Sequence, residues 1–286
     1  MYPANLHNRF RTGVLLVLMT VLVMVFGQAM GGSQGLKVAF VIAMVMNLGA
    51  WWFSADLVLA QTGAEVVGPA EAPELYQLVA HLAERADLPV PRVAIVNDPA
   101  PNAFATGRNP ANGVVAVTTG LLSLMNREEL AGVLAHELTH IKNRDILVGS
   151  VAAVMAGAIM LLANLAKFSF MFLGGRQGDG EGGGNPIAAL LLAILAPIAA
   201  MLIQAAISRS REYLADDGGA DIAGTPYGLA SALAKLGSYQ HAPQRASANT
   251  AHMYIVNPLS SRSLSNLFAT HPPLEERIAR LRGQIV

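Results

Sequence analysis

The chain has 286 residues, of which 53% are hydrophobic and only 13% are charged, whereas ordinary soluble domains carry about 25% charged residues. Part of the chain is therefore expected to face lipid. Basic and acidic residues number 19 each, and because no basic block with interleaved aromatic residues occurs, nucleic-acid binding is not expected. The absence of cysteine excludes disulfides and thiolate ligands, so only His, Asp and Glu could bind a transition metal.

Two apolar runs precede the first polar region. Residues 12–30 follow a short basic segment and are long enough to cross a bilayer, which takes about 20 residues. A signal peptide is the alternative, but its apolar run usually has about 7–15 residues, and no A-x-A cleavage site follows here. The second run, residues 36–53, contains Trp51 and Trp52, which are typical of a membrane interface. Residues 1–53 are thus predicted to form a pair of transmembrane helices.

Residues 54–145 have the charges and prolines of a soluble domain. The spacing of leucines predicts a helix over 73–85. Short runs rich in β-branched residues predict strands over 93–96 and 114–118. Two strands beside a helix would form a small sheet, and the edge of such a sheet can take up an extended substrate backbone as an additional strand.

An HExxH motif begins at His136. Positions four apart lie on one face of a helix, so His136 and His140 can bind a single metal ion. Glu137 is rotated aside, which suits a general base that does not itself bind the metal. The alternative is a solvated helix face that carries these residues by chance. Asn126 followed by Glu129 resembles a capping box and predicts that the helix begins at the next residue after Asn126.

Residues 146–207 are predicted to form a transmembrane hairpin. Two apolar runs, 146–165 and 186–207, flank the glycine-rich stretch 174–185, which suits an exposed turn. Burial against other hydrophobic helices is the alternative, and the length of the runs favours a membrane span. Residues 208–286 then return to a soluble, mostly helical pattern that ends in a charged helix over residues 274–281.

A catalytic zinc usually has three protein ligands, so a third ligand is needed. Glu212 is the candidate, because His140 and Glu212 each lie about five residues from the hairpin, or roughly 8 Å of helix. Two antiparallel spans would bring them together. Asp216, one turn after Glu212, is expected to accept a hydrogen bond from a ligand histidine. Asp145 is expected to orient His140 or to cap the next helix. An exposed helix face paired with nearby arginines is the alternative for Glu212 and Asp216.

Four motifs follow one another along the chain: NAFATGR at 102–108, HELTHIKNRD at 136–145, SRSREYLADDGGA at 208–220 and LFATHPPLEERI at 267–278. In this order they resemble the HtpX-type membrane zinc metalloproteases, which are gluzincins related to the CAAX-processing membrane proteases. The resemblance implies an integral-membrane endopeptidase with one zinc ion on His136, His140 and Glu212, and with Glu137 as the base.

The resemblance also implies where substrate binds and where the enzyme works. His271 is a candidate for stabilising the oxyanion, although it could simply precede a helix start marked by two prolines. The site is expected to face the cytoplasm at the bacterial inner membrane, where such enzymes degrade misfolded membrane proteins. The expected substrate-binding edge strand consists of Asn102, Ala103, Phe104, Ala105 and Thr106.

The charge distribution predicts the same topology. Arg9 and Arg11 precede the first apolar run. The connector between the first two runs, residues 31–35, has no charged residue, and the next charge is Lys37. The positive-inside rule therefore places the N-terminus in the cytoplasm. Four spans would return the chain to that side. The expected fold is mainly α with a small β-sheet: a multi-pass membrane protein with about four transmembrane helices and a zincin-like domain in two parts, 54–145 and 208–286.

Two other kinds of protein fit the sequence less well. A non-catalytic zinc-binding membrane chaperone or adaptor would need a closed site with four ligands, and the sequence offers three. A transporter would need ionisable residues inside its spans, and the apolar runs contain almost none. The expected partners are therefore protein substrates and the lipid bilayer, and the motifs carry no signal for an oligomeric state.

Overall fold

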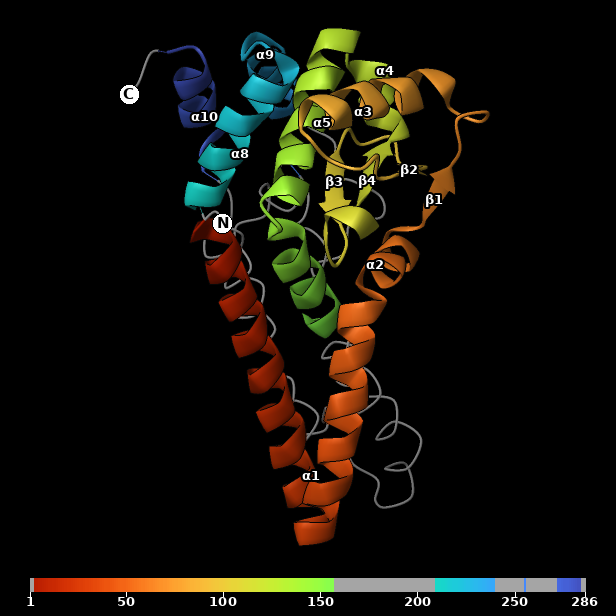
Figure 1. The fold of residues 1–286 in the computed structure, drawn as a ribbon, viewed down its shortest axis with the longest axis vertical. Coiled ribbons are helices and arrows are strands. Elements are labelled where there is room, and N and C mark those ends of the chain that lie inside the picture. The colour runs from red at the N-terminus through yellow and green to blue at the C-terminus, as the bar shows by residue number, and fades with distance from the viewer. Residues whose placement is uncertain (1–2, 157–208, 240–254, 256–271, 284–286) are drawn as a thin grey trace, which may run out of the picture.

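A mostly helical domain with one four-stranded sheet stands on two long helical arms, as the computed structural model in Figure 1 shows. The described residues are 3–156, 209–239, 255 and 272–283. Most of the predicted 146–207 hairpin, including its glycine-rich turn, lies outside these residues, and so does His271.

The two arms are the halves of one helix, α1 (Pro3–Trp52), which folds back on itself (Figure 1). The reversal lies at Gly32, whose φ of +58° is costly for a residue with a side chain. Asn47 on the second arm donates hydrogen bonds from Nδ2 to the Leu16 carbonyl (3.1 Å) and to Thr20 Oγ1 (2.8 Å) on the first arm. The two predicted helices are thus present side by side, but the expected connector belongs to the helix instead of forming a loop.

Within the described residues, one segment is both long and apolar enough to cross a membrane, namely Gly32–Trp52 with 21 residues. Thr12–Val25 and Asp145–Ala156 are shorter apolar helices. Large apolar side chains point outward along both arms, for example Val17 and Val45, which are 62% and 66% exposed. Such a surface is unfavourable in water and matches the hydrocarbon of a bilayer.

The sheet has the strand order β1-β2-β4-β3. Its strands are β1 (Ala64–Val67), β2 (Arg92–Val96), β3 (Ala103–Thr106) and β4 (Val114–Thr118). β2 and β4 run parallel, while β1 and β3 pair antiparallel with them at the two edges. The strands predicted over 93–96 and 114–118 are confirmed as β2 and β4. The sequence analysis missed β1, because its four residues include an exposed glutamate, Glu65, and show no run of β-branched residues.

Both faces of the sheet are covered by helices, which is why every residue of β4 is buried. Val115 faces the core shared with α3 (Pro73–Arg85) and α5 (Arg127–Lys142). Its neighbour Ala116 faces α2 (Ser54–Thr62) and the helix Asp145–Ala156. The helices predicted over 73–85 and 274–281 are confirmed as α3 and α10. Besides α1, the named helical elements are α2 (Ser54–Thr62), α3 (Pro73–Arg85), η1 (Pro110–Asn112), α4 (Thr119–Leu124), α5 (Arg127–Lys142), α8 (Arg209–Ala223), α9 (Tyr227–Ser238) and α10 (Leu274–Leu281).

Helix α5 begins at Arg127, as predicted. The Asn126 side chain accepts a hydrogen bond from the Glu129 backbone, and the Glu129 side chain accepts one from the Asn126 backbone, which confirms the capping box. Glycines allow α5 to pack closely against α8 and α9: a Cβ on Gly132 would lie 2.4 Å from the backbone nitrogen of Leu229. This close packing sets the position of α8 and α9 relative to the HExxH residues.

Candidate active site

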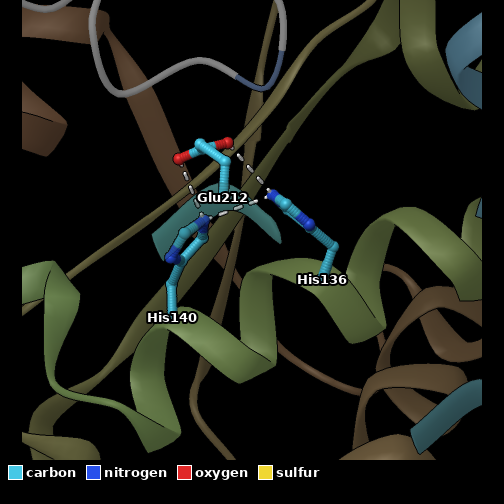
Figure 2. Close-up of side chains that lie close together, drawn as sticks. All are labelled: His136, His140 and Glu212. Atoms are coloured by element: carbon cyan, nitrogen blue, oxygen red, sulfur yellow. Dashed lines mark hydrogen bonds and ion pairs between the residues drawn. The ribbon is translucent and has the colours of Figure 1, made fainter. Parts of the chain in front are cut away.

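Three side chains that could bind a metal ion meet beside the C-terminal half of α5. His136 and His140 lie one turn apart on α5, and Glu212 reaches them from α8 (Figure 2). The two histidine Nε2 atoms are 3.2 Å apart. The Glu212 carboxylate oxygens lie 3.8 Å from His136 Nε2 and 3.7 Å from His140 Nε2. One ligand atom from each residue therefore lies within 4.8 Å of the others, and the structure brings together all three predicted ligands.

The three donor residues suit a tetrahedral metal site. Zinc bonds to imidazole and carboxylate are about 2.0–2.2 Å long, so tetrahedral ligand atoms lie roughly 3.3–3.6 Å from one another. The two Nε2 atoms, 3.2 Å apart, are close to this spacing. Each of them faces a different oxygen of Glu212, at 3.8 Å for His136 and 3.7 Å for His140, and one carboxylate oxygen lies within 4.8 Å of both nitrogens. Two nitrogens and one carboxylate are a donor set that catalytic zinc sites use, with the fourth position left for water or substrate.

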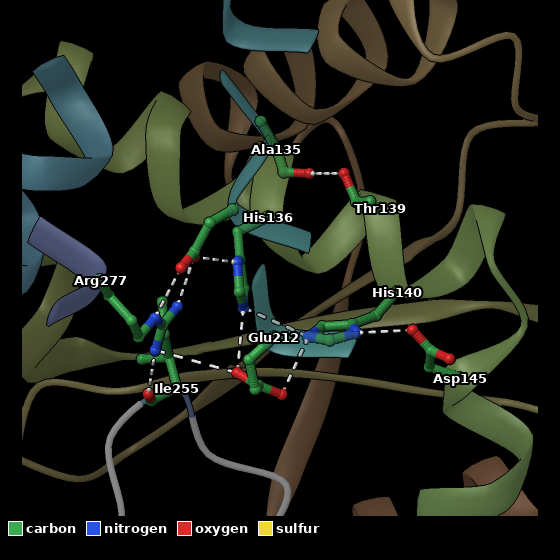
Figure 3. Close-up of polar contacts among 9 residues, drawn as sticks. Ala135, His136, Thr139, His140, Asp145, Glu212, Ile255 and Arg277 are labelled. Atoms are coloured by element: carbon green, nitrogen blue, oxygen red, sulfur yellow. Dashed lines mark hydrogen bonds and ion pairs between the residues drawn. The ribbon is translucent and has the colours of Figure 1, made fainter. Parts of the chain in front are cut away.

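Asp145 lies beside the second histidine. Its Oδ2 atom is 3.1 Å from His140 Nδ1, on the side of the ring that faces away from the other donor atoms (Figure 3). Arg144 adopts a φ of +60°, a left-handed conformation that costs a non-glycine residue roughly 1–2 kcal/mol. This turn separates α5 from the next helix and lets Asp145 face back toward α5. Arg211 Nη1 lies 3.8 Å from the other Asp145 oxygen.

Asp216 lies beside the outer ring nitrogen of His136, and the buried Arg277, labelled in Figure 3, lies beside Asp216. Asp216 Oδ1 is 3.0 Å from His136 Nδ1, although the N–H direction is off the line to that oxygen. Arg277 is fully buried and donates from Nε (2.8 Å) and Nη2 (2.6 Å) to the two Asp216 oxygens. Arg277 Nη1 also lies 3.8 Å from Glu212 Oε2. Glu212 and Asp216 are therefore buried parts of a network and not an exposed helix face.

Arg277 is the residue that the sequence analysis missed. It lies in α10, which the sequence marks only as a charged helix. The available signal was its place in the motif LFATHPPLEERI, together with the rule that a buried carboxylate needs a cationic partner. Such a bidentate pair is among the strongest that proteins form.

Burial and nearby carboxylates give the two histidines opposite pKa shifts. Burial lowers the pKa of His136, and this outweighs the opposing effect of Asp216. For His140, burial also lowers the pKa, but Asp145 and the charge of Glu212 outweigh it and raise the pKa to about 9. A cation therefore has to compete with a proton on His140 and not on His136.

Glu137 is a buried carboxyl group beside the three donor residues. Burial raises its pKa to about 7, and the nearby charge of Glu212 acts in the same direction. A carboxyl group with a pKa near neutrality can both take up and release a proton at physiological pH. This is the property that a general base needs if it must pass the proton on.

Comparisons with known proteins identify the family of the chain. The sequence model of peptidase family M48 matches residues 69–285. The chain belongs to this family. Among curated relatives, each named "Protease HtpX homolog", the M48 chain is 56% identical to one from Desulforapulum autotrophicum over 276 residues, covering 96% of this chain and 89% of the relative. It is 55% identical to one from Syntrophobacter fumaroxidans over 279 residues (96% and 99%) and 56% identical to one from Thermococcus kodakarensis over 274 residues (95% and 94%).

This M48 peptidase is a membrane-bound metalloprotease, as its family and these relatives show. A solved structure, the crystal structure of Ste24p from S. mikatae, matches with a TM-score of 0.48 and 20% sequence identity. The match covers 94% of this chain and 62% of that protein.

The segment expected to bind substrate forms the edge strand β3 of the M48 peptidase. β3 runs from Ala103 to Thr106, and Asn102 directly precedes it. The strand lies next to α5, and the backbone N–H of Ala105 faces the Glu137 carboxylate, where it partly opposes the rise in pKa that burial causes. All four residues of β3 are buried.

Proposed function

We propose that this M48 peptidase is a zinc-dependent endopeptidase in which His136, His140 and Glu212 bind the metal and Glu137 acts as general base. The observation that supports this most strongly is the convergence of the three donor atoms within 4.8 Å. Zinc is preferred over harder ions because two of the three donors are imidazole nitrogens. The burial of Glu137 next to this cluster supports its role as base.

The bound zinc would polarise the scissile carbonyl and lower the pKa of the attacking water. Glu137 takes the proton from that water and later passes it to the leaving amine. Asp216 and Asp145 lie 3.0 Å and 3.1 Å from the outer ring nitrogens of His136 and His140, and these carboxylates favour the tautomer that leaves each Nε2 free to bind metal. His271 is proposed to stabilise the negative charge that develops on the carbonyl oxygen.

The proposed substrates are misfolded or damaged membrane proteins, and the proposed location is the inner membrane of a bacterium. The apolar, outward-facing side chains of α1 support a membrane location. We propose four spans, formed by α1 as a pair (1–53) and by the hairpin 146–207, with the protease domain divided into 54–145 and 208–286. This arrangement places the zinc site on the cytoplasmic side, together with the N-terminus.

The decisive experiment separates zinc binding from proton transfer. Glu137→Gln in the detergent-purified protein should leave one zinc per chain, because Glu137 is not a ligand, and should lower cleavage of an unfolded protein by at least about 100-fold, since a general base contributes roughly 10²–10⁴-fold. Zinc content and cleavage would be measured on the same sample. His136→Ala is the matched control, which should lose both. Cleavage by Glu137→Gln at the unaltered rate would contradict the proposed mechanism.

A further inference from the structure

The outer edge of β3 offers very few main-chain groups to a substrate. In its antiparallel pairing with β4, Asn102 forms a hydrogen-bonded pair with Thr118, whose N–H donates to the Asn102 carbonyl at 2.9 Å. Because hydrogen-bonded and non-hydrogen-bonded pairs alternate, Phe104 also points its main-chain groups toward β4. The groups that point outward therefore belong to Ala103 and Ala105.

Both outward groups of Ala103 are already used by the protein. Its N–H donates to the Asn102 side-chain Oδ1 at 3.1 Å. Its carbonyl accepts a hydrogen bond from the N–H of Ile255 at 3.2 Å. Ile255 thus lies where the first residue of an added strand would lie.

Ile255 is held firmly in this position. It is 2% exposed and belongs to the main hydrophobic core, which also contains Ala103. Its carbonyl accepts a hydrogen bond from Arg277 Nη1 at 3.3 Å (Figure 3). Arg277 is itself fixed by its two hydrogen bonds to Asp216. A substrate that displaced Ile255 would expose an isoleucine and remove the carbonyl that accepts from the buried Arg277, while its own N–H would only replace the one that Ala103 loses.

Ala105 is left as the pairing residue. Its N–H faces Glu137, and within the described part of the chain its carbonyl accepts no hydrogen bond. The carbonyl can accept one substrate N–H, and the N–H can donate to a substrate carbonyl that reaches the site.

From these hydrogen bonds we infer that Ile255 blocks substrate pairing at Ala103, so that substrate pairs with β3 at Ala105 alone. The inference rests on the proposed function, in which β3 binds the substrate backbone. Ile255 is then a specificity-determining residue, because it limits how many main-chain hydrogen bonds an extended substrate can form with β3 on this side of the scissile bond. The expected substrate is a flexible segment in which one residue can adopt an extended conformation beside Ala105. A longer extended segment forms no additional main-chain hydrogen bond with β3.

The test is an amide-to-ester scan of a short peptide that the enzyme cleaves at one bond. An ester removes the N–H donor with little change in shape, and each non-scissile amide is replaced in turn. We expect one position to lower kcat/KM by about 3–10-fold, the value of one hydrogen bond, and the amide two residues further along to have no effect. Two sensitive amides spaced two residues apart would show that substrate displaces Ile255, and a scan without any sensitive amide would show that β3 does not pair with substrate; either result overturns the inference. Failure of the proposed function is distinct, because the unmodified peptide would then not be cleaved in a zinc-dependent manner.

Ile255→Pro provides a second test, since proline lacks the N–H that occupies the Ala103 carbonyl. If this variant retains zinc, the scan should gain a second sensitive amide two residues from the first, and a scan that stays unchanged contradicts the inference. Leu281→Ala is the control for loosening of the same hydrophobic core, because Leu281 is buried there on α10, and it should keep the single sensitive position. If Ile255→Pro does not fold, the scan of the unaltered enzyme decides alone.

Discussion

At the scale of single residues, the site depends on charges that are buried together. His136, His140 and Glu212 come from two helices, and each histidine has a carboxylate beside its outer ring nitrogen. Arg277 balances the negative charge of Asp216 and approaches Glu212. An unpaired carboxylate in this position would shift its pKa upward or destabilise the fold, so Arg277 belongs to the site although it does not touch the proposed metal.

The raised pKa of His140 predicts how zinc affinity changes with pH. In the metal-free protein this histidine has a pKa of about 9 and is therefore mostly protonated below about pH 9. Zinc binds only the neutral ring. Apparent zinc affinity should therefore rise about tenfold per pH unit from about pH 7 to about pH 9 and then level off. His136, whose pKa is lowered, is already neutral in this range and adds nothing to the slope.

Competition between the metal-free protein and a zinc-binding dye, measured across that pH range, would determine this slope. Asp145→Asn removes a negative charge that raises the His140 pKa, so it should move the levelling point to lower pH. An affinity that is flat from about pH 7 upward in the unaltered protein would contradict the prediction, because it would mean that His140 is already neutral.

At the scale of secondary-structure elements, the relative position of α5, α8 and α9 depends on glycines. A Cβ on Gly219 would lie 3.0 Å from the backbone nitrogen of His136, and one on Gly132 would lie 2.4 Å from that of Leu229. These contacts are between backbones, which cannot rotate away as a side chain can. The helix that carries Glu212 is thus placed directly against the helix that carries the histidines.

Gly132→Ala should therefore destabilise the protein even though alanine favours helices. We expect a loss of about 1–3 kcal/mol from overpacking, partly offset by about 1 kcal/mol of helix propensity. Thermal unfolding in detergent would measure the change. Gly49→Ala is the matched control, because in the described structure no atom lies within 4 Å of the added Cβ; it should be neutral or slightly stabilising. Equal behaviour of the two variants would contradict the packing argument.

At the scale of the whole molecule, the sheet lies between the helices around the proposed active site and the apolar helices. One face packs on α3 and α5, and the other on α2 and the helix Asp145–Ala156. That helix also packs against the first arm of α1 through Leu15 and Met19. The active helix and the edge strand are therefore connected by continuous packing to the first arm of α1.

The proposed topology predicts which parts of the chain are accessible from each side of the membrane. The protein has no cysteine, so single cysteines can be introduced without background. Ser33→Cys at the bend of α1 should react with a membrane-impermeant maleimide in intact cells, whereas Glu65→Cys in β1 should react only after the membrane is opened. Both positions are exposed. Labelling of both from the same side would contradict the proposed spans.

Much of the fold was predictable because its signals are local. The capping residue Asn126, the helix at 73–85 and the strands β2 and β4 follow from neighbouring residues in the chain, and the structure confirms them. β1 was missed because a short edge strand has little hydrophobic pattern of its own. The reversal between the first two apolar runs was expected, but not that the helix continues through it, since a φ above zero at Gly32 leaves no periodic signal.

The sequence by itself determined the chemistry of the protein: the HExxH spacing on one helix, the absence of thiolates and the apolar runs that need lipid. It also predicted Glu212 as the third donor, from the expectation that a hairpin of two antiparallel spans returns the chain to its starting side, and the structure brings Glu212 to the two histidines. Only the tertiary structure revealed that Arg277 holds Asp216 and that Ile255 occupies the edge of β3. The physical reason is that these contacts join segments far apart in the chain, where partners are selected by packing and by the need to satisfy buried polar groups, and no local pattern records that choice.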